Sequence, residues 1–390
     1  MSLNVFLFPE LEHTMRESRG TGVFPSQRIQ EFIASGRIAA ATPVEPKQIQ
    51  PASLDLRLGP VAYRVRASFL PGRFATVEEK IKELGMTEMD LVAGAVFEKR
   101  CVYIVLLQEE LRLPENISAK ANPKSTTGRL DIFTRLITDF GTEFERVPSA
   151  YKGRLFAEVV PRTFSVRVRQ GMSLNQVRFV RGNPRSLGGE KTVGERHEQD
   201  PLAFTPDDSP ADSEFRNGLP ISIDLAGKGV QEIVGYKAKS HAPLIDLSLV
   251  NHYDPGEFWE PIRSTRKIIL NPDDFYILVS KEKVRVPPDL AAEMVAYDPS
   301  IGEFRIHYAG FFDPGFGHDV AEGKGTNAVL EVRSHEVPFV IEDGQVVGRL
   351  VYERLTETPE KIYGPKIGSS YQSQGLSLSK QFRRNPEPSL

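Results

Sequence analysis

Short apolar runs separated by turn-forming residues recur along the whole chain. Val102–Leu107, Tyr276–Val279 and Val346–Tyr352 are rich in β-branched and aromatic residues, and glycine and proline are spread evenly between such runs. Many short runs of this kind are typical of the strands of a sandwich or barrel. The pattern therefore predicts an all-β protein.

Helical patterns are few. One begins at Ser26, which is suited to cap it, and ends at Gly36; its apolar residues share one face. The other begins with the capping-box pair Thr76 and Glu79 and ends at Gly85. We expect both helices to be short and to lie at the periphery of the fold.

The second half of the sequence resembles the first. A shift of 173 residues places CVYIVLLQEELRLPENISA on DFYILVSKEKVRVPPDLAA without a gap and pairs Glu158 with Glu331. SLDLRL at 53–58 resembles LIDLSL at 244–249 at a different offset, which an insertion near 70–90 would explain. This period is too long for a solenoid. It predicts two copies of one β domain.

A polar, proline-containing stretch separates the two copies. Residues 183–219 show no apolar periodicity, which is typical of a linker or a long surface loop. The predicted organisation is a first domain at 1–182, this linker, and a second domain at 220–390.

Composition narrows the class of protein. The 390 residues include 40% hydrophobic and 26% charged residues, as in globular proteins, and 390 residues suit two domains. The net charge of −3 lacks the basic excess of a nucleic-acid-binding surface. Cys101 is the single cysteine, which excludes a disulfide framework and multi-cysteine zinc patterns. Without a long apolar run or a secretory signal, we expect a soluble cytoplasmic protein that binds no membrane.

The strongest candidate for binding chemistry is a loop that follows Pro123. It combines two cations, three hydroxyls and a glycine: Lys124, Ser125, Thr126, Thr127, Gly128 and Arg129. Cations neutralise a phosphate, hydroxyls donate to its oxygens, and glycine lets the backbone approach it. A solvated turn is the alternative, but the aligned stretch YDPSIG at 297–302 lacks both cations. This asymmetry favours a function for the loop.

Each copy also carries a glutamate within an apolar strand. Glu158 lies in LFAEVV and Glu331 in AVLEVR. Strand alternation could place each carboxylate on the wet face, whereas burial would raise its pKa toward a value useful for proton transfer. The sequence leaves both alternatives open.

Two further segments belong to the second copy. Residues 309–317, AGFFDPGFG, combine an Asp-Pro-Gly turn with aromatic residues that could belong to the core or pack on a base. The tail between Tyr363 and Gln374 is rich in small, amide and aromatic residues. It is either a frayed terminus or a segment that folds over a ligand.

Together these motifs resemble the dCTP deaminases of the dUTPase-like superfamily. The loop at 124–129 is similar to that family's R-S-S-x-x-R motif, and Phe312–Phe316 resembles its I-D-P-G-[YFW] segment. Val329, Leu330 and Glu331 resemble its V-L-E strand. The tyrosine, lysine and glutamine of the family's tail correspond to Tyr363, Ser370 and Gln374 here. The segment Ile49–Gly59 resembles the start of the family's domain. The motifs follow the family's order over nearly all of the chain.

The resemblance implies two tandem, dUTPase-like, distorted jelly-roll domains with a few short peripheral helices. In the family each site lies between adjacent subunits, one of which supplies the phosphate loop and the other the glutamate and base pocket. This implies one site made of the loop of copy one and the pocket of copy two, within a homo-oligomer. Two positions depart from the family, because Lys124 and Ser370 stand where it has arginine and lysine. Either departure could lower the affinity for the triphosphate or narrow the range of substrates.

The implied reaction is hydrolytic deamination of dCTP to dUTP and ammonia without zinc. The resemblance gives Glu331 the role of general base and acid, with Glu158 as the runner-up. The loop would hold the triphosphate together with Mg²⁺, to which no protein side chain is assigned. Asp313 would contact the deoxyribose, while Tyr363 and Gln374 would close the tail over the nucleotide.

Two other functions are compatible with the same residues. A dUTP diphosphatase, or a bifunctional enzyme that converts dCTP to dUMP, could use the same scaffold. A nucleotide-sensing protein that binds without turnover is the third hypothesis.

Overall fold

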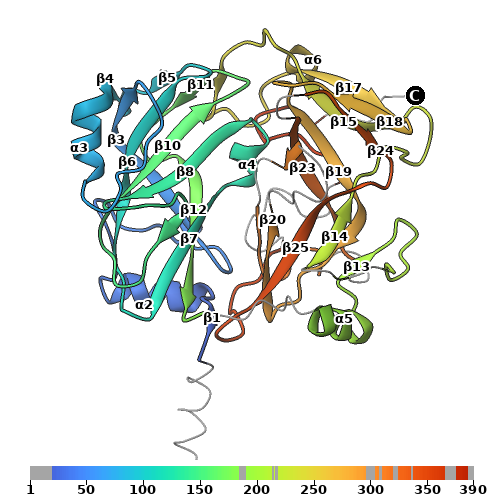
Figure 1. Ribbon diagram of the computed structural model, residues 1–390, viewed down its shortest axis with the longest axis horizontal. Coiled ribbons are helices and arrows are strands. Elements are labelled where there is room, and N and C mark those ends of the chain that lie inside the picture. The colour runs from blue at the N-terminus through green and yellow to red at the C-terminus, as the bar shows by residue number, and fades with distance from the viewer. Residues whose placement is uncertain are drawn as a thin grey trace, which may run out of the picture.

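The computed structural model describes residues 20–183, 190–212, 215, 218–295, 304–306, 310–318, 324–334, 337–364 and 375–384. Two β-rich halves lie side by side, the N-terminal half in blue to green and the C-terminal half in yellow to red (Figure 1). The all-β prediction is confirmed.

Strands of the first half flank a few short helices. The strands are β1 (Gly22–Val23), β2 (Ile38–Ala40), β3 (Leu54–Val65), β4 (Gly85–Asp90), β5 (Ala95–Phe97), β6 (Val102–Arg112), β7 (Ile117–Pro123), β8 (Ile132–Thr138), β9 (Arg146–Val147), β10 (Lys152–Pro161), β11 (Val166–Val168) and β12 (Ser173–Arg181). The helices are α2 (Ser26–Ala34), the 3-10 helix η1 (Pro46–Gln48), α3 (Val77–Leu84) and α4 (Ser125–Gly128).

The second half has the same character. Its strands are β13 (Ala203–Phe204), β14 (Leu219–Ser222), β15 (Ile233–Ala238), β16 (Ile245–Asp246), β17 (Trp259–Arg263), β18 (Lys267–Leu270), β19 (Tyr276–Val284), β20 (Leu290–Val295), β21 (Phe304–Ile306), β22 (Phe311–Phe312), β23 (Thr326–Ser334), β24 (Phe339–Glu342) and β25 (Val346–Arg354). Its helices are α5 (Glu190–Gln199) and α6 (Pro255–Phe258).

Both predicted helices are present at the edge of the first half. Thr76 caps α3: its hydroxyl accepts the Glu79 N–H at 3.2 Å, and the Glu79 carboxylate accepts the Thr76 N–H at 2.7 Å. In α2 the capping position is Pro25 and Ser26 is the first helical residue, so the expected Ser26 cap was wrong. Proline preorganises the backbone there without a side-chain cap.

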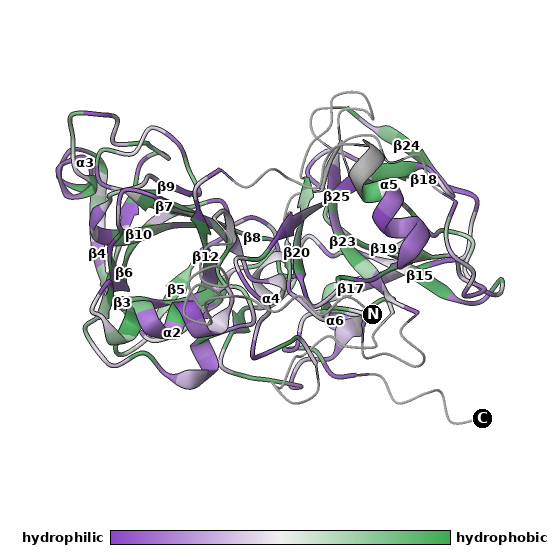
Figure 2. Ribbon diagram, turned by 90° about the horizontal axis from the view of Figure 1, so that it is seen from below, coloured by the Kyte–Doolittle hydropathy of each residue, from purple (hydrophilic) through white to green (hydrophobic). Residues whose placement is uncertain are grey.

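Long strand β3 connects the layers of the first half. Its first residues pair with β12, and from Leu58 onward it pairs with β6. The sheet order is β8-β10-β6-β3-β12-β7-β9. In the second half β17-β15-β19-β23-β21 forms one sheet and β14-β25-β20-β22 another. Figure 2 shows the strands of each half curving around its interior.

Equivalent strands of the two halves pair in the same register. Ile104 faces Glu158 between β6 and β10, and Ile277 faces Glu331 between β19 and β23. The same correspondence holds between the β7–β12 and β20–β25 pairs. The 173-residue shift seen in the sequence therefore matches strand pairing as well.

One alignment drawn from the sequence needs correction. Strand β14, at Leu219–Ser222, pairs with β25 in the register in which β3 pairs with β12. Residues 244–249 instead contain β16, which pairs in parallel with β11 of the first half. The match of 53–58 to 244–249 was wrong, because similar alternation occurs in strands with different partners.

The linker interpretation of residues 183–219 was also wrong over much of its length. This stretch forms α5 and β13, and β13 pairs with β19. Val193, Leu202 and Ala203 are buried in the core of the second half. The few apolar residues here are too widely spaced to give a periodic pattern, so their burial depends on tertiary contacts.

Apolar side chains from the two halves join in a shared core. Phe164 of the first half packs edge-on against Phe258 and Trp259 of the second, with ring centroids 5.8 Å and 5.4 Å apart. Phe382, near the C-terminus, joins the same cluster. The relative placement of the halves is therefore fixed by apolar burial. Within the described part of the chain, no helix is long and apolar enough to cross a membrane.

A buried ion pair also crosses the boundary. Nε of Arg333 in the second half lies 3.2 Å from Oδ2 of Asp131 in the first, and both side chains are almost fully buried. The Thr163 hydroxyl accepts an Arg333 N–H at 2.8 Å. Removing one partner of this pair would leave the other charge buried and uncompensated, which strongly destabilises a fold.

Asp131→Ala should lower the free energy of unfolding by about 3–5 kcal/mol, because the Arg333 guanidinium would stay buried without its carboxylate. Denaturant unfolding followed by circular dichroism measures this loss. The control is Glu98→Ala, which breaks the exposed 3.2 Å pair with Arg64 and should cost less than about 1 kcal/mol. Equal losses in both variants would contradict the structural role of the Asp131–Arg333 pair.

Candidate active site

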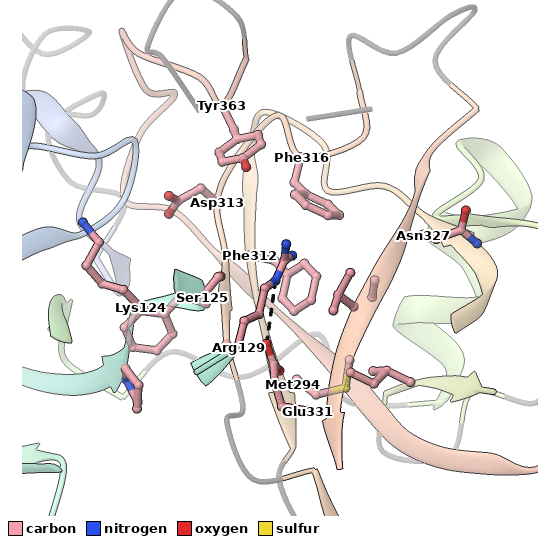
Figure 3. A pocket seen from close by; sticks show the side chains of 16 residues that line it. Lys124, Ser125, Arg129, Met294, Phe312, Asp313, Phe316, Asn327, Glu331 and Tyr363 are labelled. Atoms are coloured by element: carbon pink, nitrogen blue, oxygen red, sulfur yellow. Dashed lines mark ion pairs between the residues drawn. The ribbon is translucent and has the colours of Figure 1, made fainter. Parts of the chain in front are cut away.

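One cavity lies between the two halves and is lined by residues of both. Figure 3 shows its side chains, with the Arg129–Glu331 pair near the centre. The first half contributes Pro123, Lys124, Ser125 and Arg129, and the second half contributes Met294, Gly310, Phe311, Phe312, Asp313, Phe316, Asn327, Ala328, Val329, Leu330, Glu331 and Tyr363. The cavity therefore combines the two parts that the sequence separates into different copies.

The cationic loop follows β7 directly and coils into the single turn α4. The Lys124 N–H donates to Leu174 O at 2.9 Å, and the Gly128 N–H donates to Lys124 O at 2.9 Å, which fixes the start of the turn. The Lys124 ammonium pairs with the carboxylate of Asp55 on β3. Burial raises the pKa of Asp55, and the charge of Lys124 opposes this rise.

Glu331 is buried at the inner end of the cavity. It lies on β23, between β19 and β21, and only 5% of the residue is exposed. Burial raises the pKa of its carboxyl to about 8, and the charge of Arg129 partly opposes this rise. Nε of Arg129 lies 3.9 Å from Oε1 of Glu331. Of the two alternatives left open by the sequence, the buried one is correct for Glu331.

The Asp-Pro-Gly turn brings the start of the tail to the cavity. Gly315 has a φ of 93°, in the left-handed region that favours glycine. A Cβ on Gly315 would lie 2.9 Å from Tyr363 O, so glycine also permits this close approach. The Tyr363 N–H donates to Pro314 O at 2.7 Å. Tyr363 is thereby held beside Asp313.

Arg178 of the first half contacts this turn. Its guanidinium is fully buried, lies 3.4 Å from Oδ1 of Asp313 and donates to Ala292 O at 3.1 Å. It also lies 4.1 Å from the centre of the Phe311 ring. Burial raises the pKa of Asp313 to about 6, and the charge of Arg178 opposes the rise. Sequence reasoning missed Arg178, since a lone arginine in a strand carries no local signal.

Aromatic rings form one wall of the cavity. Phe312 meets Phe316 edge-on at 5.0 Å, and Phe316 packs against Tyr363 at 5.5 Å between ring centroids. These rings line the cavity as well as packing on one another. They offer a flat apolar surface of the kind on which a nucleotide base packs.

Glu158 has a different environment. It is fully buried on β10, where Oε1 accepts a hydrogen bond from Nε of Arg135 at 3.0 Å. The Arg135 guanidinium also lies over the Phe144 ring, 3.4 Å from its centre. Glu158 does not line the cavity of Glu331. In the first half an arginine thus occupies the space beside the glutamate.

The C-terminal residues contact the cationic loop. The Ser379 hydroxyl donates to Thr126 O at 3.0 Å, and Nη1 of Arg129 donates to Ser377 O at 3.1 Å. The predicted tail residues Ser370 and Gln374 lie outside the described residues. Residues 375–384 therefore contact the loop, whereas the alternatives left open for the segment between Tyr363 and Gln374 stay predictions.

The predicted loop residues are distributed along this site. Lys124, Ser125 and Arg129 line the cavity of Glu331, whereas Thr126 and Thr127 line its outward continuation. Gly128, the last residue of the turn α4, lines neither part. Among the described residues, no group of three metal-ligating side chains could hold a metal ion.

Comparison with known proteins agrees with this arrangement. The family model of the 2'-deoxycytidine 5'-triphosphate deaminase (DCD) N-terminal domain matches residues 20–183, and that of the DCD C-terminal domain matches 189–382. The chain belongs to the dCTP deaminase family. The resemblance inferred from the motifs is thereby confirmed.

Individual relatives support the same assignment. The crystal structure of 2'-deoxycytidine 5'-triphosphate deaminase from Agrobacterium tumefaciens is 50% identical and has a TM-score of 0.82; the match covers 86% of this chain and all of that one. A dUMP-forming dCTP deaminase of Halobacterium salinarum is 32% identical, over 43% of this chain and 82% of its own. One from Streptomyces coelicolor is 33% identical, over 36% and 71%. The dUTPase-like fold expected of a dCTP deaminase family member is therefore confirmed.

Removing the buried carboxyl should stabilise the protein in a pH-dependent way. Between the ordinary pKa of 4.5 and the folded value of about 8, unfolding of the native chain releases the Glu331 proton, so its stability falls as pH rises. Glu331→Gln cannot ionise. The Tm of this variant minus the native Tm should therefore increase as pH rises from 4.5 to about 8.

Thermal unfolding at several pH values measures this difference, and Glu158→Gln is the matched control. That variant should have a lower Tm than the native chain, because Arg135 loses its charged partner. A Tm difference for Glu331→Gln that stays constant with pH would contradict the raised pKa.

Proposed function

We propose that this protein hydrolyses dCTP to dUTP and ammonia, without zinc, in pyrimidine deoxynucleotide metabolism. The observation that carries the proposal is the buried Glu331, which faces Arg129 of the cationic loop at 124–129 in a cavity that Lys124 and Ser125 also line. A proton-transfer group, aromatic rings and a phosphate-binding loop thus surround one cavity. These three features suit a base, a sugar and a triphosphate.

The glutamate supplies the proton transfers. Glu331 takes a proton from water as the oxygen attacks C4 of cytosine, and then gives a proton to the departing amino group, which leaves as ammonia. A pKa of about 8 lets the carboxyl serve in both directions near neutral pH. The positive charge of Arg129 favours the ionised form of Glu331, so a fraction of the molecules carries the carboxylate that accepts the proton.

The remaining residues bind and orient the nucleotide. Lys124, Ser125, Thr126 and Arg129 hold the triphosphate, and Asp313 accepts a hydrogen bond from the deoxyribose. Arg178 holds the Asp313 carboxylate in place. Val329, Leu330 and Tyr363 line the cavity together with Glu331. By the resemblance to the family, Tyr363 and Gln374 would close the tail over the ligand.

The triphosphate carries most of the negative charge of the substrate. We infer that Mg²⁺ enters bound to it, because this ion prefers phosphate oxygens and keeps several waters. The Asp55 carboxylate at this end of the cavity is already neutralised by its ion pair with Lys124. No protein side chain is assigned as a ligand of the ion.

We also propose that the chain arose by tandem duplication. Support comes from the equal strand registers of the two halves and from the division of the site between them. One chain then holds one productive site, and Arg135 fills the corresponding space of the first half. Homo-oligomer formation, a cytoplasmic location and the absence of a nucleic-acid partner stay predictions.

A second candidate function is formation of dUMP. The two curated relatives named above are dUMP-forming, and Asp313 is compatible with dUTP hydrolysis as well. A bifunctional enzyme or a dUTP diphosphatase would release pyrophosphate. A nucleotide sensor would bind dCTP without releasing either product.

The purified protein, given dCTP and Mg²⁺, should release ammonia and dUTP in equal amounts. Glu331→Gln should lower kcat by about 10²–10⁴-fold, the usual contribution of a general acid–base group. Enzymatic detection of ammonia and chromatography of the nucleotides measure both effects. Glu158→Gln is the control, since Glu158 lies outside the cavity.

The products separate the remaining functions. Pyrophosphate in equal amount to ammonia would identify a dUMP-forming enzyme. Loss of activity in Glu158→Gln but not in Glu331→Gln would move the site to the first half. Tight binding of dCTP without turnover in any sample would favour the nucleotide-sensing protein over both enzymes.

The pH dependence of activity follows from the Glu331 pKa. Because the carboxylate form accepts the proton from water, kcat/KM should rise with pH and level off above about 8. Initial rates at low dCTP concentration across a pH series measure this. The Glu158→Gln profile should match the native one, and a profile without an inflection near the Glu331 pKa would contradict Glu331 as the base.

A further inference from the structure

The cavity continues outward beyond Asp313. Lys124, Ser125, Asp313 and Tyr363 line both the inner cavity and this continuation. Glu331 lines the inner part alone. With the base beside Glu331, the continuation is where the distal phosphates of a nucleotide would extend.

The C-terminal segment at 375–384 contributes a cation to this outer part. Lys380 lines it together with Lys124, Thr126 and Asp55. None of the sequence motifs that predict the site includes Lys380. Its position in the cavity results from the return of the chain end to the loop.

Apolar packing and backbone hydrogen bonds hold Lys380 in place. Phe382 is buried and packs on Phe258 and Trp259, with centroids 5.3 Å and 5.9 Å apart. The Ser379 hydroxyl donates to Thr126 O at 3.0 Å, so the residue preceding Lys380 is bound to the phosphate loop itself. A lysine on such an anchored segment loses little further backbone freedom on binding a ligand.

The charges around Lys380 favour an anion. Burial lowers the pKa of Lys380, the nearby charge of Lys124 lowers it further, and Asp55 opposes both. Asp55 already pairs with Lys124. The charges of Lys124 and Lys380 therefore repel each other at this point, and a polyphosphate would relieve their repulsion.

We propose that Lys380 binds the distal phosphates of the substrate and makes the site selective for nucleoside triphosphates over monophosphates. The role rests on the proposed function. Lys380 adds a cation beside Lys124 in the outer part of the cavity. Lys380 is not part of the apolar core, so it can be changed with little effect on that core.

The test compares Lys380→Gln with the native chain on dCTP and dCMP. Loss of a charged hydrogen bond should raise KM for dCTP by about 10–100-fold and leave kcat within about twofold. The rate with dCMP, which has no distal phosphate, should not change. Lys380→Arg should restore most of the affinity, because it keeps the charge.

Arg384→Gln is the matched control, since it removes a positive charge from an exposed residue of the same segment that does not line the cavity. Its KM for dCTP should equal the native value. An unchanged KM in Lys380→Gln, or an equal change with dCMP, would overturn the proposal. Equal KM increases in both variants would also overturn it, as they would show a general charge effect.

A binding measurement separates this proposal from the proposed function. Calorimetry with inorganic tripolyphosphate needs no turnover, and Lys380→Gln should bind it about tenfold or more weakly than the native chain. Weaker binding in the variant would support the role of Lys380 even if dCTP were not deaminated. Equal binding by the two proteins would overturn the role whatever the reaction.

Discussion

The desolvation of Glu331 is the constraint on which the site depends. A carboxyl at that depth keeps its proton near neutral pH, and the opposing cation, Arg129, comes from the other half of the chain. The two halves must therefore be held together closely. The buried Asp131–Arg333 pair and the aromatic cluster around Trp259 supply that attachment. The packing that joins the halves thus also sets the proton affinity of the candidate catalytic group.

Glu158 shows how strongly surroundings determine the role of a residue. It has the same strand register as Glu331 and is equally buried, but it pairs with Arg135, and the guanidinium lies on the Phe144 ring. A glutamate held in such a pair has no space beside it for a substrate. One half can then keep the fold and supply the phosphate loop while the other keeps the pocket.

The segment at 375–384 contributes to the site because of where it lies in the fold. Residues 375–384 cross back to the first half, where Ser379 contacts the loop and Phe382 enters the shared core. This return places Lys380 beside Lys124. An anchored cation there complements a polyphosphate without altering the inner pocket, so selectivity for the phosphate chain and proton transfer are carried by separate residues.

The sequence alone predicted the strand-rich fold, the internal repeat, the family and most cavity residues, because apolar alternation and motif spacing are local features. It could not place Arg178, Lys380 or the strand pairing of residues 219–222, which depend on contacts between distant segments. It ranked Glu331 above Glu158 only through the resemblance of Val329–Glu331 to the family's V-L-E strand. The tertiary structure decided the surroundings of each glutamate, because burial and the nearest cation determine where a proton resides.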